Sequence, residues 1–396
     1  MSWLADASPW QLLAGLHLLI SSVVYLPSLV SALVRRLGSS GASLTRDELV
    51  ISALKPMRGL DPSLESNLES FARLDVPDAF EVLLLLDDVR DEALPLAEKM
   101  AKRYPKRFRV IVGTSPGMTN PKVASLCHAL PFAKNSLIWV TDSNVETSDE
   151  HLRAQMLEWK GIQAKGRRPT LIHAPIAAVG GSGLGARLER LQLATYNTVN
   201  AETTLAAGID AVVGKSLFLH RDDLKAVGGL EAFAAASGED FLMGRAFHQV
   251  GVVRSARRTT RQVLGEHLTL ADFWKRQARW AKVRHRMTPL AFMLLEPFSY
   301  FGTAFLWMSL GLLPWQVVAG VMGVKMAGDS VLMLAIAGEV RLLDVVVLPL
   351  KEAVLLLVWA STFFTREVTW RGRRLTVESG GDYRAHVVEP PSTLHP

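Results

Sequence analysis

Four long apolar stretches divide this chain and limit what it can fold into. Each is roughly 22 to 25 residues long, a length that crosses a bilayer as a helix, and they cover residues 10–34, 289–313, 315–338 and 343–364. The intervening chain, from about Thr45 to Met287, mixes polar and apolar residues as a water-soluble domain does. We therefore expect a soluble domain held at a membrane, with one apolar segment before it and up to three after it.

Charged residues beside the first stretch predict its orientation. Asp6 precedes the stretch, whereas Arg35 and Arg36 follow it. This arrangement is typical of an uncleaved anchor whose N-terminus is outside and whose basic end is in the cytoplasm. The soluble domain would then face the cytoplasm, in a multi-pass protein of the inner (cytoplasmic) membrane.

The later stretches carry ionisable side chains, which at membrane depth usually face a bundle interior or a polar cavity. These are Glu296, Lys325, Asp329, Lys351 and Glu352. A hairpin or an interfacial helix explains at least one of these stretches as well as a crossing does. Four crossings would also place the arginines of residues 366–374 outside, against the positive-inside rule. We therefore expect a cytoplasmic tail.

These considerations predict five divisions of the chain. They are an anchor over residues 1–44, a cytoplasmic α/β domain over 45–268, a basic amphipathic helix over 269–288, membrane helices over 289–364 and a basic tail over 365–396.

The composition agrees with a membrane protein that has a cytoplasmic domain. The 396 residues are 49% hydrophobic, carry a net charge of +6 and have a pI of about 9.5. The single cysteine, Cys127, excludes an intramolecular disulfide and suits a reducing compartment. The positive charge suits anionic headgroups, a nucleotide diphosphate or orientation in the bilayer, and we expect no nucleic-acid partner.

Within the soluble domain, apolar runs alternate with helical patterns. The expected strands are residues 49–54, 80–86, 108–112 and 136–140, and the expected helices are residues 64–74, 93–103 and 122–130. Such alternation predicts an α/β fold with a mostly parallel sheet and crossover helices. Side chains just past the carboxyl ends of the strands then lie on the edge where open α/β sheets bind ligands.

Carboxylates follow two of these strands. Asp88, with Asp91 behind it, follows one strand, and Asp142 with Asn144 follows another. Asp88 suits the base and ribose of a nucleotide, and the oxygens of Asp142 and Asn144 suit Mg²⁺ or Mn²⁺ on a diphosphate. An aspartate after a strand is also often an ordinary helix cap. The prediction of a nucleotide and metal site therefore depends on these residues occurring together.

Two further motifs complete the chemistry of a transfer from a nucleotide sugar. Asp240 is the candidate general base for an acceptor hydroxyl, and Glu239 is its rival. Arg276 and Arg279 share one helical face, with Trp280 adjacent, so a guanidinium can hold a diphosphate while the indole packs at the acceptor pocket.

The segment from Thr269 to Met287 predicts a basic amphipathic helix. Such a helix, just ahead of an apolar stretch, is expected to lie in the headgroup plane. A purely electrostatic anchor would use the same side chains without touching a substrate. The basic residues are Lys275, Arg276, Arg279, Lys282, Arg284, His285 and Arg286.

Taken together, the motifs between residues 51 and 297 resemble those of the ceramide glucosyltransferase family, glycosyltransferase family 21. This family is related to the family 2 synthases. The resemblance is to a bacterial member of the family. Matching segments are Leu54-Lys55-Pro56, Glu81-Val82-Leu83-Leu84 leading to Asp88, Asn120-Pro121-Lys122, Leu137-Ile138-Trp139 leading to Asp142-Ser143, Glu239-Asp240, and Arg276 to Trp280.

The resemblance implies a GT-A-type domain and a role for each matching residue. Asp88 would contact the nucleotide, Asp142 would bind the metal, and Asp240 would be the base. Lys55 and Lys122 would lie near the donor. The element that holds the product phosphate and gates the acceptor would be Arg276, Arg279 and Trp280.

This sequence departs from related synthases at Asn144, where many carry a second aspartate, so the identity of the metal stays open. The expected reaction is transfer of glucose from UDP-glucose to the primary hydroxyl of ceramide, with inversion implied by the family. The alternative is transfer of N-acetylglucosamine from UDP-N-acetylglucosamine to a hopanoid lipid. A polymer synthase and a non-catalytic membrane scaffold are the other classes that we considered.

Overall fold

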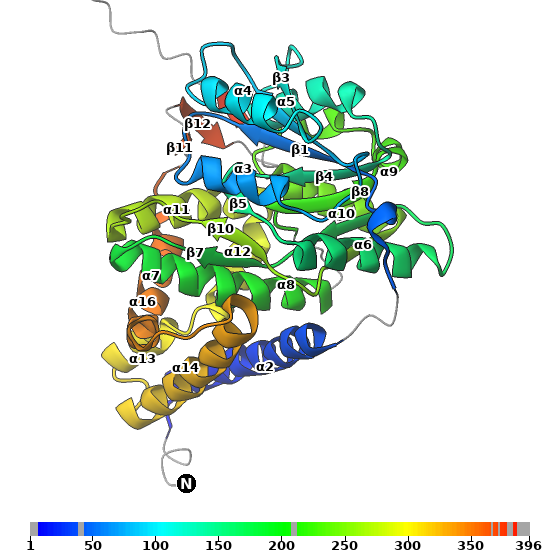
Figure 1. Cartoon of the computed structure of the whole chain (residues 1–396). Coiled ribbons are helices and arrows are strands. Elements are labelled where there is room, and N and C mark those ends of the chain that lie inside the picture. Colours follow the sequence, from blue (N-terminus) through cyan, green and yellow to red (C-terminus); the bar gives the residue numbers. More distant parts are fainter. Residues whose placement is uncertain are drawn as a thin grey trace, which may run out of the picture.

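An α/β domain sits above a layer of helices, and two long helices lie at the far side of that layer (Figure 1). The computed structural model describes residues 7–38, 43–206, 212–365, 367–370, 373–377 and 383–385. All structural statements below concern these residues.

A mixed seven-stranded sheet forms the centre of the α/β domain. Its order is β3-β2-β1-β4-β8-β6-β9. The first four strands in this order are parallel, β8 is antiparallel to both of its neighbours, and β9 is parallel to β6. The strands are β1 (Ile51–Met57), β2 (Glu81–Leu86), β3 (Phe108–Val112), β4 (Leu137–Thr141), β6 (Thr170–His173), β8 (Ser216–His220) and β9 (Val252–Ser255).

Helices cover both faces of this sheet, which is why β2 is buried along its whole length and apolar after Glu81. Val82, Leu84 and Leu86 pack on one face, whereas Leu83 and Leu85 pack on the other. The helices are α3 (Leu64–Ala72), α4 (Leu94–Arg103), α5 (Pro121–Ala129), α6 (Asp149–Gln163), α9 (Arg221–Ala226) and α10 (Glu239–Val250). The predicted GT-A-like α/β class with a mostly parallel sheet is confirmed.

A small second sheet and a helical layer join this domain to the long helices. Gly185 lets the layer pack closely, because a Cβ there would lie 2.0 Å from the carbonyl oxygen of Thr269. Thr269 in turn caps α11 by accepting from the backbone N–H of Asp272. The elements are β5 (Val145–Glu146), β7 (Ile176–Val179), β10 (Thr260–Val263), α7 (Gly183–Leu191), the π-helical turn η3 (Gln192–Tyr196), α8 (Asn197–Ala206) and α11 (Leu270–Met287).

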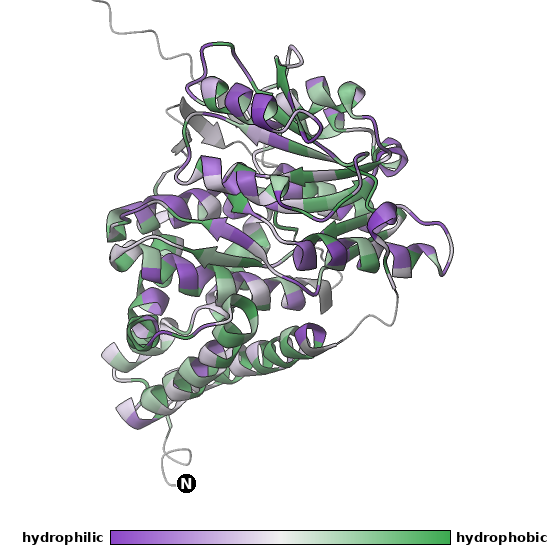
Figure 2. Ribbon diagram, viewed as in Figure 1, coloured by the Kyte–Doolittle hydropathy of each residue, from purple (hydrophilic) through white to green (hydrophobic). Residues whose placement is uncertain are grey.

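Two helices are long and apolar enough to cross a membrane, α2 (Pro9–Leu37) and α14 (Trp315–Ala337) (Figure 2). The other two apolar stretches are broken into short helices. Gly302, whose Cβ would lie 2.3 Å from the backbone oxygen of Glu352, marks where the chain turns closely past a neighbouring helix. The short helices are α12 (Pro289–Leu294), η5 (Glu296–Ser299), α13 (Thr303–Ser309), α15 (Leu342–Val346) and α16 (Leu348–Ser361).

The C-terminal segment returns to the α/β side of the molecule. It forms a three-stranded antiparallel sheet of β11 (Glu367–Trp370), β12 (Arg373–Val377) and β13 (Tyr383–Ala385). The Lys282 ammonium on α11 donates to the carbonyl oxygen of Glu367 at 2.8 Å. Since α11 itself packs against α7 and α16, this hydrogen bond attaches the small sheet to the helical layer.

Four ionisable residues of the last two apolar stretches form one buried cluster, whereas Glu296 pairs separately with Arg284 of α11. Asp329 on α14 pairs with Lys325 and accepts from the Tyr25 hydroxyl of α2 at 2.8 Å. On α16, Lys351 lies 2.9 Å from Glu352 and 3.8 Å from Asp329. Each of these four charged side chains is no more than 4% exposed. The two lysines and two carboxylates therefore balance in charge where three helices meet.

Removing one charge from this cluster should destabilise the protein strongly. Asp329→Ala leaves two buried ammonium groups short of a counter-charge, and we expect a loss of about 3 to 5 kcal/mol in unfolding free energy. Unfolding in detergent micelles would measure this. Glu339→Ala is the control, because its carboxylate pairs with Arg341 at a site about half exposed and should cost under about 1 kcal/mol. Equal losses in both variants would contradict the assigned role.

Candidate active site

The carboxylate of Asp142 lies between two lysines at the end of β4. Its Oδ1 is 3.0 Å from the Nζ of Lys122, and its Oδ2 is 2.7 Å from the Nζ of Lys215. Burial alone would raise the pKa of Asp142, but these two ammonium groups outweigh burial and hold it well below its usual range. Asp142 is therefore a fixed negative charge at the edge of the sheet.

Lys55 holds the backbone of this turn and does not reach an open site. It lies on β1 with its side chain fully buried, and its ammonium donates to the carbonyl oxygens of Asp142 at 2.7 Å and Val145 at 3.1 Å. Burial lowers the pKa of Lys55 to about 7. Lys55 therefore positions the Asp142 turn from within the sheet, and its place near the donor stays a prediction.

Lys122 joins the second acidic motif to the third. It lies at the start of α5, and its ammonium is 3.0 Å from both Asp142 Oδ1 and Glu239 Oε1. Asn120, the N-cap of α5, donates its side-chain amide to the carbonyl oxygen of Ala236 at 2.8 Å. The segment before α10 is thereby fastened to α5, which brings residues about a hundred positions apart into one site.

Asp240 is held next to Glu239 by backbone groups. Its Oδ2 accepts from the backbone N–H of Gly214 at 2.7 Å, and its Oδ1 accepts from that of Phe241 at 2.9 Å. A Cβ at Gly214 would lie 2.9 Å from Asp240, so glycine is needed for this approach. Burial and the charge of Glu239 raise the pKa of Asp240 to about 6. A carboxylate with such a pKa is well matched to proton abstraction near neutral pH.

Two oxygens at this site converge on a single position for a cation. Lys215 Nζ lies 2.7 Å from Asp142 Oδ2 and 3.1 Å from Asn144 Oδ1. A carboxylate and an amide oxygen are hard donors that suit Mg²⁺ or Mn²⁺. Across the described residues, no group of three or more His, Cys, Asp or Glu side chains converges in this way. The donor set therefore fits a divalent ion that takes its remaining ligands from phosphate and water.

The first acidic motif stands apart from this network. Asp88 is exposed after β2 and accepts from the backbone N–H of Arg90 at 2.9 Å. Its neighbour Asp87 turns inward instead, where it accepts from the Ser125 hydroxyl and lies 3.8 Å from Arg58. The structure thus groups the second and third motifs and leaves Asp88 at the rim.

The Arg276 to Trp280 motif lies on α11. The Arg276 guanidinium stacks over the Trp280 ring at 5.2 Å and pairs with Glu189 of α7 at 3.0 Å. Burial lowers the pKa of Lys215, and the charge of Arg276 lowers it further against the opposing pull of Asp142. Arg276 therefore acts on the same site as Asp142. Arg279 lies half-buried on the same helix.

Lys215 and Glu189 were missed by the sequence analysis. Lys215 immediately precedes β8, and β8 pairs with β4 across a gap of more than seventy residues. A lysine before an apolar run has no local signature, so its place beside Asp142 depends on this pairing. Glu189 is one of several charges on an amphipathic helix, and only the packing of α7 against α11 identifies it.

Curated proteins and solved structures with similar chains were found. Ceramide glucosyltransferase 1 of Caenorhabditis elegans is 25% identical over 266 residues, which are 66% of this chain and 55% of that protein. Ceramide glucosyltransferase of Komagataella phaffii is 26% identical over 300 residues, 62% of this chain and 58% of that protein. The chain thus spans little more than half the length of these relatives.

A mannosyltransferase, PcManGT from Pyrobaculum calidifontis in complex with GDP-Man and Mn²⁺, shows 13% identity, covers 89% of this chain and 99% of its own, and has a TM-score of 0.49. At that score the likeness bears on neither substrate nor metal. A family model, Glycosyl transferase family 21, matches residues 17–383. The chain belongs to glycosyl transferase family 21.

Proposed function

We propose that this glycosyltransferase moves glucose from UDP-glucose to the primary hydroxyl of ceramide, with inversion at the sugar carbon. The observation that carries the proposal is the Lys122 bridge, with 3.0 Å to Asp142 and 3.0 Å to Glu239. It supports the proposal, because the carboxylate assigned to the donor side and the Glu239 neighbour of the candidate base Asp240 share one ammonium group. The choice of ceramide is supported by the relatives that the chain resembles.

On the donor side, Asp142 and Asn144 would hold Mg²⁺ or Mn²⁺, which when bound neutralises the charge that develops on the leaving diphosphate. Lys215 and Arg276 add positive charge at the same place. Asp88, at the rim of the sheet edge, would contact the nucleotide. These positive groups would favour departure of UDP more than binding of the neutral sugar.

On the acceptor side, Asp240 would take the proton of the lipid hydroxyl as that oxygen attacks the sugar. One bond forms between the hydroxyl oxygen and the anomeric carbon, and the bond from that carbon to the diphosphate breaks. A single displacement of this kind inverts the configuration. Arg279 and Trp280 on α11 would line the entrance through which the acceptor lipid reaches the active site.

A membrane location is supported by α2 and α14, which are long and apolar enough to span. We place the α/β domain on the cytoplasmic side of the inner membrane, because Arg35 and Arg36 end α2 next to that domain. The acceptor lipid would then approach from the bilayer beneath the helical layer.

The test is lipid mass spectrometry. Membranes that contain the protein are incubated with ceramide or a hopanoid polyol and with UDP-glucose or UDP-N-acetylglucosamine, and Asp240→Asn membranes are the control. The proposal expects hexosylceramide from UDP-glucose alone. An N-acetylhexosaminyl hopanoid would instead establish the alternative reaction, and no sugar transfer to any lipid would contradict both.

The pH dependence separates the two candidate bases. A base must be deprotonated to act, so kcat/KM should rise as pH passes through about 6, the value to which burial and Glu239 raise the pKa of Asp240. Glu239→Gln removes a charge that raises this pKa, so the midpoint should move to lower pH. Asp240→Asn should lower turnover by roughly 10²- to 10⁴-fold and leave UDP affinity nearly unchanged. Lost turnover in Glu239→Gln with activity retained in Asp240→Asn would make Glu239 the base.

The affinity for metal tests the cation position without any assay of transfer. An ammonium and a divalent ion compete for Asp142 Oδ2 and Asn144 Oδ1, and like charges about 4 Å apart repel by ~4 kcal/mol at an effective dielectric constant near 20. Lys215→Met should therefore bind Mn²⁺ at least about tenfold more tightly, measured by electron paramagnetic resonance without donor. Asp142→Asn should bind more weakly.

Lys99→Met, which removes an exposed lysine on α4, is the matched control and should leave Mn²⁺ affinity unchanged. If Asp142→Asn and Lys215→Met both bind Mn²⁺ like the parent protein, the ion is held elsewhere.

A further inference from the structure

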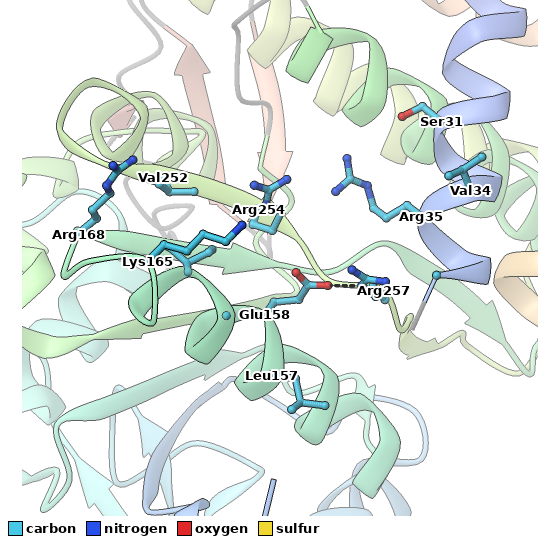
Figure 3. Close-up of a pocket in the computed structure, with 13 residues that line it drawn as sticks. Ser31, Val34, Arg35, Leu157, Glu158, Lys165, Arg168, Val252, Arg254 and Arg257 are labelled. Carbon is cyan, nitrogen blue, oxygen red and sulfur yellow. Dashed lines mark hydrogen bonds and ion pairs between the residues drawn. The ribbon is translucent and has the colours of Figure 1, made fainter. Parts of the chain in front are cut away.

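A cavity of about 760 Å³ lies away from the candidate active site, between the end of α2, the end of α6 and the edge strand β9 (Figure 3). This volume is in the range of small-molecule sites. It shares no lining residue with the candidate active site. Its ionisable lining side chains are Arg35, Lys165, Arg168, Arg254, Arg257 and Glu158.

Only two of the five cations are balanced by carboxylates. Arg257 pairs with Glu158 at 2.7 Å, and Arg35 pairs with Glu202 of α8 at 2.8 Å. Within the part of the chain that the structure describes, no carboxylate lies within ion-pair distance of the remaining three, which are Lys165, Arg168 and Arg254. The cavity therefore has an excess of about three positive charges, counted from these pairs.

Two of the unbalanced cations, together with the paired Arg35, come from separate elements and face one space. Figure 3 shows Arg254 of β9, Lys165 of the loop after α6 and Arg35 of α2 pointing toward the same hollow. Arg254 is half-buried, so its guanidinium is partly withdrawn from water without a protein anion to replace the lost hydration. Phosphate oxygens are the groups that such converging guanidinium and ammonium donors bind best.

An exposed apolar stripe on α2 ends at this cavity. Leu19, Val23, Leu26, Val30 and Val34 recur at helical spacing on one face, and they are between 43% and 64% exposed. Val34 also lines the cavity. The apolar stripe of α2 is thus continuous with the positively charged cavity. The same arrangement is found where a membrane-spanning helix reaches the lipid headgroups.

We propose that this cavity binds the phosphate headgroup of an anionic phospholipid, with the acyl chains lying along the stripe of α2. The charge excess selects a net negative headgroup, and the stripe selects a lipid over a free phosphate. The bound lipid joins α2 to β9 and so fixes the height of the α/β domain above the bilayer. This inference rests on the membrane placement proposed above and not on the identity of the transferred sugar.

The experiment uses the full chain, purified in a neutral detergent. Phosphatidylglycerol, phosphatidylcholine and inorganic phosphate are titrated separately, bound lipid is counted by native mass spectrometry, and the thermal midpoint is recorded. Phosphatidylglycerol alone should bind and raise the midpoint. The double variant Arg254→Gln/Lys165→Gln should lose affinity by roughly fivefold for each cation, about 25-fold in all.

The matched control, Lys102→Gln/Lys134→Gln, removes two exposed lysines away from the cavity and should bind like the parent protein. Lys165→Gln alone replaces an exposed side chain and should show its fivefold loss even if the double variant fails to fold. Equal affinity in the parent and the cavity variants would overturn the proposal.

Inorganic phosphate that stabilises the parent as well as phosphatidylglycerol does would also overturn it, by assigning the cavity to a soluble anion. If phosphatidylcholine bound as tightly as phosphatidylglycerol, the proposal that the positive charge of the cavity selects an anionic headgroup would be wrong. Neither readout uses sugar transfer, so failure of this test and failure of the proposed reaction are distinguishable.

Discussion

The negative charge of Asp142, whose side chain is 25% exposed, is the constraint on which the site depends. It cannot remain at the end of a covered sheet without nearby cations, and Lys122 and Lys215 supply them at 3.0 and 2.7 Å. Each lysine lies far from Asp142 in the sequence and is linked to other groups of the site. Lys122 also pairs with Glu239. Lys215 follows Gly214, whose backbone N–H donates to Asp240. The lysines that neutralise the Asp142 carboxylate thus bring the candidate base, the cation position and the Arg276 residue of α11 close to the end of β4.

The side of the molecule that carries α2 and α14 uses charge in two different ways. Between α2, α14 and α16 the ionisable groups are fully buried and balance one another, which stabilises the packing of three helices and leaves nothing for a ligand. At the end of α2 the cations that line the cavity exceed the carboxylates, and the excess faces a space large enough for a ligand. The first arrangement is structural, and the second carries the lipid proposal.

Much of the fold could be predicted from the sequence because its signals are local. Strand 108–112 and the helix beginning after Thr269 lie where the apolar run and the basic amphipathic pattern predicted them. The strand-end position of Asp142 and the Glu239-Asp240 motif named residues that the structure brings to one ammonium group, that of Lys122. What could not be predicted depends on distant contacts. These are the pairing of β8 with β4 that brings Lys215 to Asp142, the full burial of Lys55, and the close approach of Gly302 to the backbone of Glu352 between two short helices.

The account is tested most directly by a structure of the protein with UDP and Mn²⁺. It predicts that the diphosphate lies at the end of β4, that Mn²⁺ contacts Asp142 Oδ2 and Asn144 Oδ1, and that the Lys215 ammonium has moved from the position it occupies here, 2.7 Å from Asp142. A diphosphate bound in the basic cavity at the end of α2, with the pairs of Asp142 to Lys122 and Lys215 unchanged, would contradict the assignment of the active site.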